Sequence, residues 1–300
     1  MNVQFQQRAN DDFFKARIHE TMGKIFAAIS NKDESLLPFS KVKSAIKPKS
    51  EKYKGVKPIR IGSIVGSEDR YDDFDKQFLP SGKHLEGRWK RVDLAYYEDI
   101  TLPPIRLYEI SGVYFVRDGN HRISVARAKG VEFIDAEITA LDADIKLDPK
   151  APLKKIKESI LLFERERFCG NTGIGKLRPE TDIVFTEMGR YEELHEHISV
   201  HKYYINLELP TEIPFETALL SWHDNVYKPI AEIIKKERIL LRFPNRTDSD
   251  LYVWTIMYWD DLKKKYGQDF PLHKAIINFS SAFGSNLIQR LFGAVRSFSK

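Results

Sequence analysis

The chain has 300 residues, 42% of them hydrophobic, and a formal net charge of +5 from 48 Lys and Arg against 43 Asp and Glu. This length predicts roughly two domains, and the ordinary apolar fraction with charges of both signs excludes a disordered or fibrous chain. The single cysteine, Cys169, excludes an internal disulfide and a cysteine-ligated zinc site, so we expect a reducing, cytoplasmic setting.

The chain carries no sign of export or of membrane insertion. Its first residues, MNVQFQQRANDDFF, lack the apolar core and cleavage site of a secretory signal. No stretch approaches the roughly 18 uncharged apolar residues of a spanning helix, so we expect a soluble protein without a membrane partner. The pI near 9.0 is compatible with phosphate-bearing partners, but so small a charge surplus does not require DNA.

The N-terminal part predicts one helix and a linker. Residues 11–30 repeat apolar side chains at helical spacing, which predicts an amphipathic helix. Residues 41–57 are rich in lysine and interrupted by proline and glycine, which favours a solvated connector. We therefore group residues 1–55 as an N-terminal helix and a basic connector.

Residues 56–147 predict a small α/β domain. Two of its strands are separated by a short link that ends in Gly112, which is typical of a tight hairpin. A polar turn and a helix of small residues follow the hairpin, and a further strand closes the unit. The expected strands are 58–65, 104–109, 113–117 and 133–139, and the expected helices are 86–99 and 123–130.

Residues 148–300 predict a helical domain. Prolines at 149 and 152 mark its boundary, and glycines and prolines separate its segments. The last segment is amphipathic and is expected to pack against the body or a partner chain, so a homo-oligomer stays open. The expected helices are 153–168, 190–207, 215–240, 248–266 and 272–298. The fold class is therefore α+β: a small α/β domain preceded by an N-terminal helix and followed by a larger all-helical domain.

The most informative stretch is the turn Asp118-Gly119-Asn120-His121-Arg122. A strand leads into this turn and the turn opens into a helix, whose first backbone N–H groups attract anions. Gly119 permits close approach of a ligand, Arg122 offers a planar fork for phosphate oxygens, and His121 adds a donor that titrates. Asp118 suits either Mg²⁺ or the orientation of Arg122. The alternative is that Asp118 and Asn120 merely cap the helix.

Residues 56–141, with Leu102-Pro103-Pro104-Ile105 before the hairpin and the Asp118–Arg122 turn after it, resemble the ParB/sulfiredoxin superfamily. In that superfamily the matching turn binds nucleotide phosphates. Sulfiredoxins carry their reactive cysteine in this turn, whereas this chain has Asn120 there, so sulfiredoxin activity is excluded. Most of the chain also resembles a bacterial family without an established activity that joins a ParB-like domain to a helical extension.

The turn is most similar to that of the ParB-like free-serine kinases, which have Asp-Gly-His-His-Arg. This resemblance implies ATP or ADP, Mg²⁺, a small hydroxyl-bearing acceptor, and a glutamate after the first strand as catalytic base. That glutamate is Glu68, in an acidic loop that is otherwise an ordinary surface loop. The implied catalytic residues are Glu68, Asp118 and His121, the implied nucleotide contacts are Ser67, Arg70, Gly119, Asn120, His121 and Arg122, and Asp118 is the implied Mg²⁺ ligand. Asp72 or Asp73 is expected to assist the metal.

This prediction of a phosphotransferase requires an open helix start and an Arg122 guanidinium that is free of internal ion pairs. The alternative function is a nucleotide-gated DNA-binding or partition-type regulator, in which residues 41–57 and 154–167 grip phosphate backbones. ParB clamp proteins have Gly-Glu-Arg-Arg in the turn and a following helix-turn-helix, neither of which is found here. A nuclease is the weakest candidate, because acids cluster only at 68–75.

The helical half offers a second set of candidates. Glu193, His197 and His201 follow one another at one-turn spacing, which permits a metal site or histidines packed at a helix interface. His223 and Asp224 form a further pair, and we expect that His201, His223 or Asp224 serves the acceptor site. Arg246, Asp248 and Asp250 indicate helix capping.

Overall fold

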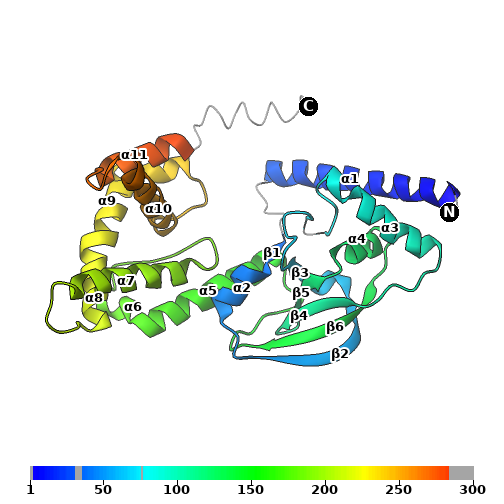
Figure 1. Cartoon of the computed structure of the whole chain (residues 1–300), viewed down its shortest axis with the longest axis horizontal. Coiled ribbons are helices and arrows are strands. Elements are labelled where there is room, and N and C mark those ends of the chain that lie inside the picture. Colours follow the sequence, from blue (N-terminus) through cyan, green and yellow to red (C-terminus); the bar gives the residue numbers. More distant parts are fainter. Residues whose placement is uncertain (1–2, 31–35, 76, 284–300) are drawn as a thin grey trace. The chain divides into compact units, whose positions relative to one another are not determined.

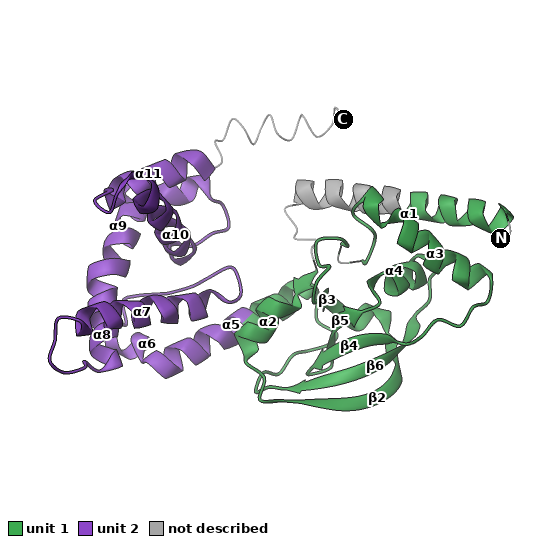
Figure 2. Ribbon diagram, viewed as in Figure 1, with its two compact units in different colours: residues 1–160 green, residues 161–300 purple. Residues whose placement is uncertain are grey.

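The computed structural model describes residues 3–30, 36–75 and 77–283, and the side chains of 17–30 lie outside the description. The chain divides into two compact units, residues 1–160 and 161–300 (Figure 2). The division falls inside helix α5 (Leu153–Thr172) rather than at the proline-rich boundary near residue 148. Residues 1–55 belong to the same unit as the α/β domain. The expected α+β fold class is confirmed.

Unit 1 contains a six-stranded sheet in the order β1-β3-β5-β4-β6-β2 (Figure 1). Strands β1, β3 and β5 run parallel to one another, β4 and β5 form an antiparallel hairpin, and β4 pairs in parallel with β6. Ser111 and Gly112 both have positive φ, as a tight hairpin turn requires. The elements are α1 (Val3–Ser30), β1 (Leu37–Pro38), α2 (Phe39–Ile46), β2 (Ser50–Arg60), β3 (Ile64–Ser67), α3 (Glu86–Tyr97), β4 (Ile105–Ile110), β5 (Val113–Asp118), α4 (Asn120–Ala128) and β6 (Phe133–Asp142).

The prediction of a solvated connector at 41–57 is wrong. The segment contains most of α2, which buries Phe39, Val42 and Ala45, and most of β2, which pairs antiparallel with β6. The many lysines suggested a solvated loop, but they lie on β2, which is the last strand of the sheet and exposes nearly all its side chains. Lysine is common on such strands because its charge stays in water.

Helices cover both faces of the sheet. On one face, Leu107 and Val116 join Ile123 of α4 in a buried apolar cluster. Trp89 of α3 donates to Ser124 of α4 at 2.9 Å, which ties these two helices together. On the other face, the ring of Phe39 in α2 stacks on Tyr108 with centroids 4.2 Å apart. The sheet is thus fixed on both sides and positions the turn between β5 and α4 rigidly.

Unit 2 is helical around one apolar core that includes Leu194, Trp222, Tyr252 and Ile276. The expected single helix 215–240 is interrupted, because residues 223–227 form one π-helical turn and Arg238 has φ of +50°. The expected helix 272–298 is described as far as Phe283. The elements after α5 are α6 (Ile174–Leu177), α7 (Arg190–Asn206), α8 (Phe215–Trp222), the π turn η3 (His223–Tyr227), α9 (Lys228–Lys236), a 3₁₀ turn η4 (Ile239–Arg242), α10 (Asp248–Tyr266) and α11 (Leu272–Phe283).

None of the helices in the described ranges is long and apolar enough to cross a membrane.

Candidate functional site: the start of helix α4

The turn between β5 and α4 is shaped by Gly119. Its φ is +113°, and a Cβ at this position would lie 2.4 Å from Cγ2 of Ile105. Only glycine satisfies both the positive φ and the contact with Ile105. Because the chain turns so sharply, α4 begins at the end of the strand and its first N–H groups have no partner within the helix.

The loop after β3 lies beside this turn. Strands β3 and β5 are parallel neighbours, and Ser67 is level with Val116. The N–H of Glu68 donates to the carbonyl of Val116 at 2.9 Å, which extends the pairing by one residue. Because the two strands are parallel, their C-terminal ends lie at the same end of the sheet. Residues 67–73 and 118–122 therefore share one site.

Arg122 does not meet the requirement for a free guanidinium. It donates to the carboxylate of Asp118 at 2.6 Å and to the backbone carbonyls of Pro103 and Pro104, and its side chain is only 13% exposed. Direct binding of phosphate by Arg122 is therefore incompatible with this arrangement. Of the two roles expected for Asp118, the structure shows the one in which it orients Arg122. Arg122 contacts only Oδ2 of Asp118, whose side chain is 52% exposed, so the role of Asp118 as Mg²⁺ ligand stays a prediction.

His121 lies at the centre of the site and is 5% exposed. Its Nε2 lies 3.2 Å from Nη1 of Arg70. Burial, followed by the charges of Arg88, Arg70 and Arg91, lowers the pKa of His121 from 6.5 to about 4, and the charge of Asp73 opposes this shift. The ring is therefore neutral at pH 7. Because arginine only donates, Nε2 accepts and the proton resides on Nδ1.

Two buried polar atoms at the start of α4 lack hydrogen-bond partners among the described residues: Nδ1 of His121 and Oδ1 of Asn120. An unpaired buried donor costs free energy unless a ligand or water meets it. The alternative that Asp118 and Asn120 merely cap the helix is not supported, because no side chain caps the start of α4.

The remaining predicted residues lie around this centre. Arg70 pairs with Asp73 at 3.4 Å, and Asp73 also lies 3.2 Å from His84. Ser67 is fully buried and its hydroxyl lies 3.5 Å from the carbonyl of Val116. Glu68 is half-buried and interacts electrostatically with Lys43 and Tyr108, which lie on the α2 face of the sheet.

The sequence argument missed Arg88 and Arg91. Both lie in the first turns of α3, three residues apart, and the fold directs their charge toward His121. The i, i+3 spacing of two arginines on a predicted helix was the available signal, because it places both on one face.

The metal site considered in unit 2 is not formed. Among the described residues, no group of three His, Cys, Asp or Glu side chains could hold a metal ion. Nδ1 of His197 lies 3.3 Å from the hydroxyl of Tyr252, and Nε2 of His201 lies 3.0 Å from that of Ser221. These histidines follow the alternative of packing at a helix interface.

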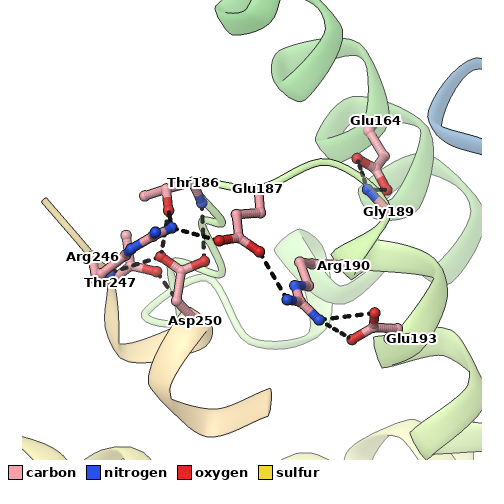
Figure 3. A network of polar contacts seen from close by, with 9 residues as sticks. All are labelled: Glu164, Thr186, Glu187, Gly189, Arg190, Glu193, Arg246, Thr247 and Asp250. Atoms are coloured by element: carbon pink, nitrogen blue, oxygen red, sulfur yellow. Dashed lines mark hydrogen bonds and ion pairs between the residues drawn. The ribbon is translucent and has the colours of Figure 1, made fainter. Parts of the chain in front are cut away.

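A polar network holds the loop before α7 against the start of α10 (Figure 3). Asp250 accepts from Thr186 through both carboxylate oxygens and, with Thr247, forms a capping box, which confirms the expected helix capping. Arg246 donates to the hydroxyl of Thr186 and to the carboxylate of Glu187. Arg190 donates to Glu187 and to Glu193, which extends the network. Nearby, both carboxylate oxygens of Glu164 accept from the N–H of Gly189. The ion pairs of Glu187 and Glu193 with Arg190 and Arg246, together with these hydrogen bonds, stabilise unit 2.

Comparisons with known proteins add little to this description. No family model and no curated protein matches the chain. Among solved structures, the chain is similar to the C2221 crystal form of a Pnob8-like ParB-N domain, with 12% sequence identity and a TM-score of 0.21. That similarity covers 81% of this chain and 93% of the other.

Proposed function

We propose that unit 1 binds the phosphate groups of a nucleotide, ATP or ADP, at the start of α4 through Arg70, Arg88 and Arg91, which take the place of the internally paired Arg122. One observation carries the proposal: three arginines, Arg70, Arg88 and Arg91, direct positive charge at a buried neutral histidine whose Nδ1 has no partner in the described structure. The free N–H groups of the first turn of α4 add to the same field.

The charge at this site suits a di- or triphosphate better than a carboxylate. Of the charged groups with the largest effect on His121, three are arginines and one, Asp73, is an acid. A ligand with two or more negative charges would balance the remainder and accept from Nδ1 of His121. Arg122 then has a structural role. Its hydrogen bonds to Asp118 and to the carbonyls of Pro103 and Pro104 hold the turn that exposes the first backbone N–H groups of α4.

The bound nucleotide would serve as phosphoryl donor to a small hydroxyl-bearing molecule. Phosphoryl transfer needs cations around the moving phosphate and a carboxylate near the attacking oxygen. Arg70 and Arg88 supply the first, and Glu68, in the loop beside the turn, is the candidate for the second once its carboxylate turns from Lys43 and Tyr108 toward the site. Mg²⁺ would enter with the nucleotide phosphates, as it commonly does, with Asp118 and Asp72 as exposed carboxylates nearby.

Calorimetry with ATP, ADP and pyrophosphate, with and without Mg²⁺, tests binding. Each charge-assisted hydrogen bond contributes about 1.5–3 kcal/mol, so Arg88→Ala and Arg91→Ala should each weaken pyrophosphate binding about tenfold or more. The matched control is Arg106→Ala, since Arg106 is an exposed arginine of β4 paired with Glu137. Equal affinities in all variants would contradict the site.

Titration of His121 by NMR gives an independent measure. A bound polyphosphate offsets the charges of the arginines, so its addition should raise the pKa of His121 from about 4. A pKa that pyrophosphate leaves unchanged, at a concentration that saturates calorimetric binding, would place the anion elsewhere.

Turnover is tested separately by ADP release from Mg-ATP across a panel of small alcohols and hydroxy acids. Loss of a catalytic base reduces rates about 10²–10⁴-fold, which is the expected effect of Glu68→Gln on kcat. If nucleotide binds but no hydroxyl compound promotes ADP release, the phosphotransferase function fails while the binding site stands.

The second candidate is a nucleotide-gated DNA-binding regulator. The observation that favours it is a row of exposed lysines on β2, Lys52, Lys54 and Lys57, none of which has an ion pair within the described structure. Duplex binding measured by fluorescence anisotropy should then fall steeply with salt, and Lys52→Glu with Lys54→Glu should flatten that dependence. Nucleotide-independent or absent duplex binding would exclude this function.

A further inference from the structure

Unit 2 contains a chain of hydrogen bonds that links a hydroxyl, an imidazole, a carboxylate and a guanidinium. Oγ1 of Thr181 lies 2.7 Å from Nε2 of His223, and Nδ1 of the same ring lies 2.6 Å from Oδ1 of Asp224. Arg178 donates to both oxygens of Asp224, from Nε at 3.0 Å and from Nη2. The four residues come from the segment after α6 and from the π turn.

The donors and acceptors fix the proton positions. Arg178 only donates, so Asp224 accepts through both oxygens, and Arg178 with His223 holds the pKa of Asp224 well below its usual range. An ionised Asp224 requires that Nδ1 of His223 carry a proton. In the neutral ring, Nε2 then presents its lone pair to the Thr181 hydroxyl, which donates.

The backbone holds this order of groups in place. The π turn places His223 and Asp224 next to each other while the ring of His223 packs against Tyr227. The side chain of His223 is 2% exposed and that of Asp224 is 45% exposed. Thr181 is partly exposed, and its N–H donates to the carbonyl of Arg178 at 3.0 Å. The base is therefore sheltered from water, and the residue that carries the hydroxyl is partly exposed.

We propose that Thr181 is a nucleophile for acyl transfer, with His223 as its general base and Asp224 as the residue that positions the ring. Nucleophile, base and orienting carboxylate at hydrogen-bond distance are the arrangement that recurs in unrelated acyl-transfer enzymes, where geometry and not chain order identifies it. Arg178 extends the arrangement by holding the carboxylate. This site is independent of the phosphate site proposed for unit 1.

The reaction balances with groups that the chain supplies. Nε2 of His223 takes the hydroxyl proton as Oγ1 of Thr181 bonds to the carbonyl carbon of an ester, and the C=O electron pair moves to oxygen. When that pair returns, the ester C–O bond breaks and the leaving alcohol takes the proton from Nε2. Thr181 is left as an acyl ester, which water releases as an acid by the same steps. The substrate class is therefore an ester of a small alcohol.

A fluorophosphonate probe tests the nucleophile directly, because its phosphorus is attacked by an activated hydroxyl and fluoride leaves. Peptide mass spectrometry of the full-length chain should find one adduct, on Thr181. Thr181→Val should abolish it, and His223→Gln should slow labelling by about 10²–10⁴-fold. Asp224→Asn should slow it similarly, because an asparagine can leave the ring in the wrong tautomer. The matched controls are the exposed residues Thr211→Val and His195→Gln, which should label as the wild type does.

A structural role for the same hydrogen bonds is distinguished by a second measurement. The Nδ1 proton of His223, bound to Asp224, should give a downfield imidazole resonance in the wild type and in Thr181→Val and should be lost in Asp224→Asn. If this resonance is present and Thr181 takes no label, the proposal is overturned. Equal labelling of the wild type and of Thr181→Val would overturn it as well.

Discussion

Arg122 and Asp118, four residues apart, form an ion pair of 2.6 Å across the turn that joins β5 to α4. The same guanidinium reaches back to the carbonyls of Pro103 and Pro104, so one side chain ties the start of α4 to the segment before β4. Arg122 therefore stabilises the turn, and the charge available to a ligand comes from other arginines.

Arg122→Lys should destabilise unit 1 by about 1–3 kcal/mol, because an ammonium cannot bond the Asp118 carboxylate and both carbonyls together. Urea unfolding measures the change. Arg106→Ala is the control, and its exposed ion pair with Glu137 should matter little. Unchanged stability combined with lost pyrophosphate binding would show instead that Arg122 is itself a phosphate ligand.

Gly119→Ala should lower the unfolding free energy of unit 1 by more than the cost of placing an alanine at a positive φ. Its new Cβ would lie 2.4 Å from Cγ2 of Ile105, whereas at Gly130, also at positive φ, nothing lies within 4 Å. Gly130→Ala should cost about 1 kcal/mol, and Gly119→Ala about 1–3 kcal/mol more because the core must shift. Urea unfolding of both variants provides the comparison. Equal losses would show that Ile105 yields without cost.

His121 should make stability depend on pH. Its pKa in the folded protein, about 4, lies below the ordinary 6.5, so the unfolded chain takes up the proton first as pH falls. The contribution of His121 is complete above pH 6.5 and is lost progressively toward pH 4, up to about 3 kcal/mol. His121→Gln should flatten the pH dependence of the unfolding free energy over this window, and exposed His84→Gln should not. Parallel profiles for His121→Gln and the wild type would contradict the burial of this ring.

Lys129 should be essential to unit 1, because it pairs at 2.8 Å with Asp93, whose side chain is 0% exposed. Lys129→Met leaves a buried charge and should cost about 3–5 kcal/mol at pH 7. Burial raises the pKa of Asp93, and Lys129 opposes that rise. Without Lys129 the pKa rises further, so stability should be partly regained as pH falls and Asp93 protonates. Asp93→Asn in the Lys129→Met background should also restore stability, and a loss below about 1 kcal/mol in the single variant would contradict this account.

Local sequence signals predicted the elements around the candidate site. Apolar runs on both sides of Gly112 predicted the hairpin, and Asp248 and Asp250 indicated the start of α10, whose expected bounds agree with the structure. Both signals are short-range, because the residues that determine them are neighbours in the chain.

The errors came from contacts between distant segments. Whether Arg122 is free depends on the carbonyls of Pro103 and Pro104, and whether His121 is charged depends on Arg88 of α3. The hydrogen bond between Thr181 and His223 spans 42 residues. The spacing and composition of the sequence do not determine the distances between residues that are far apart in the chain. The sequence therefore indicated which functional groups are present but not which of them are in contact.

Strand β2 is an edge strand of the sheet, and this position affects the tendency of the protein to aggregate at high concentration. Among the described strands only β6 pairs with β2, so one row of its backbone N–H and C=O groups can accept a strand from another molecule. Lys52, Lys54 and Lys57 oppose that approach, because stacking copies of β2 would crowd like charges and strip them of water. Neutral residues of high β-propensity at these three positions would preserve the fold of the monomer. They would also promote fibrils that assemble through the exposed edge of β2.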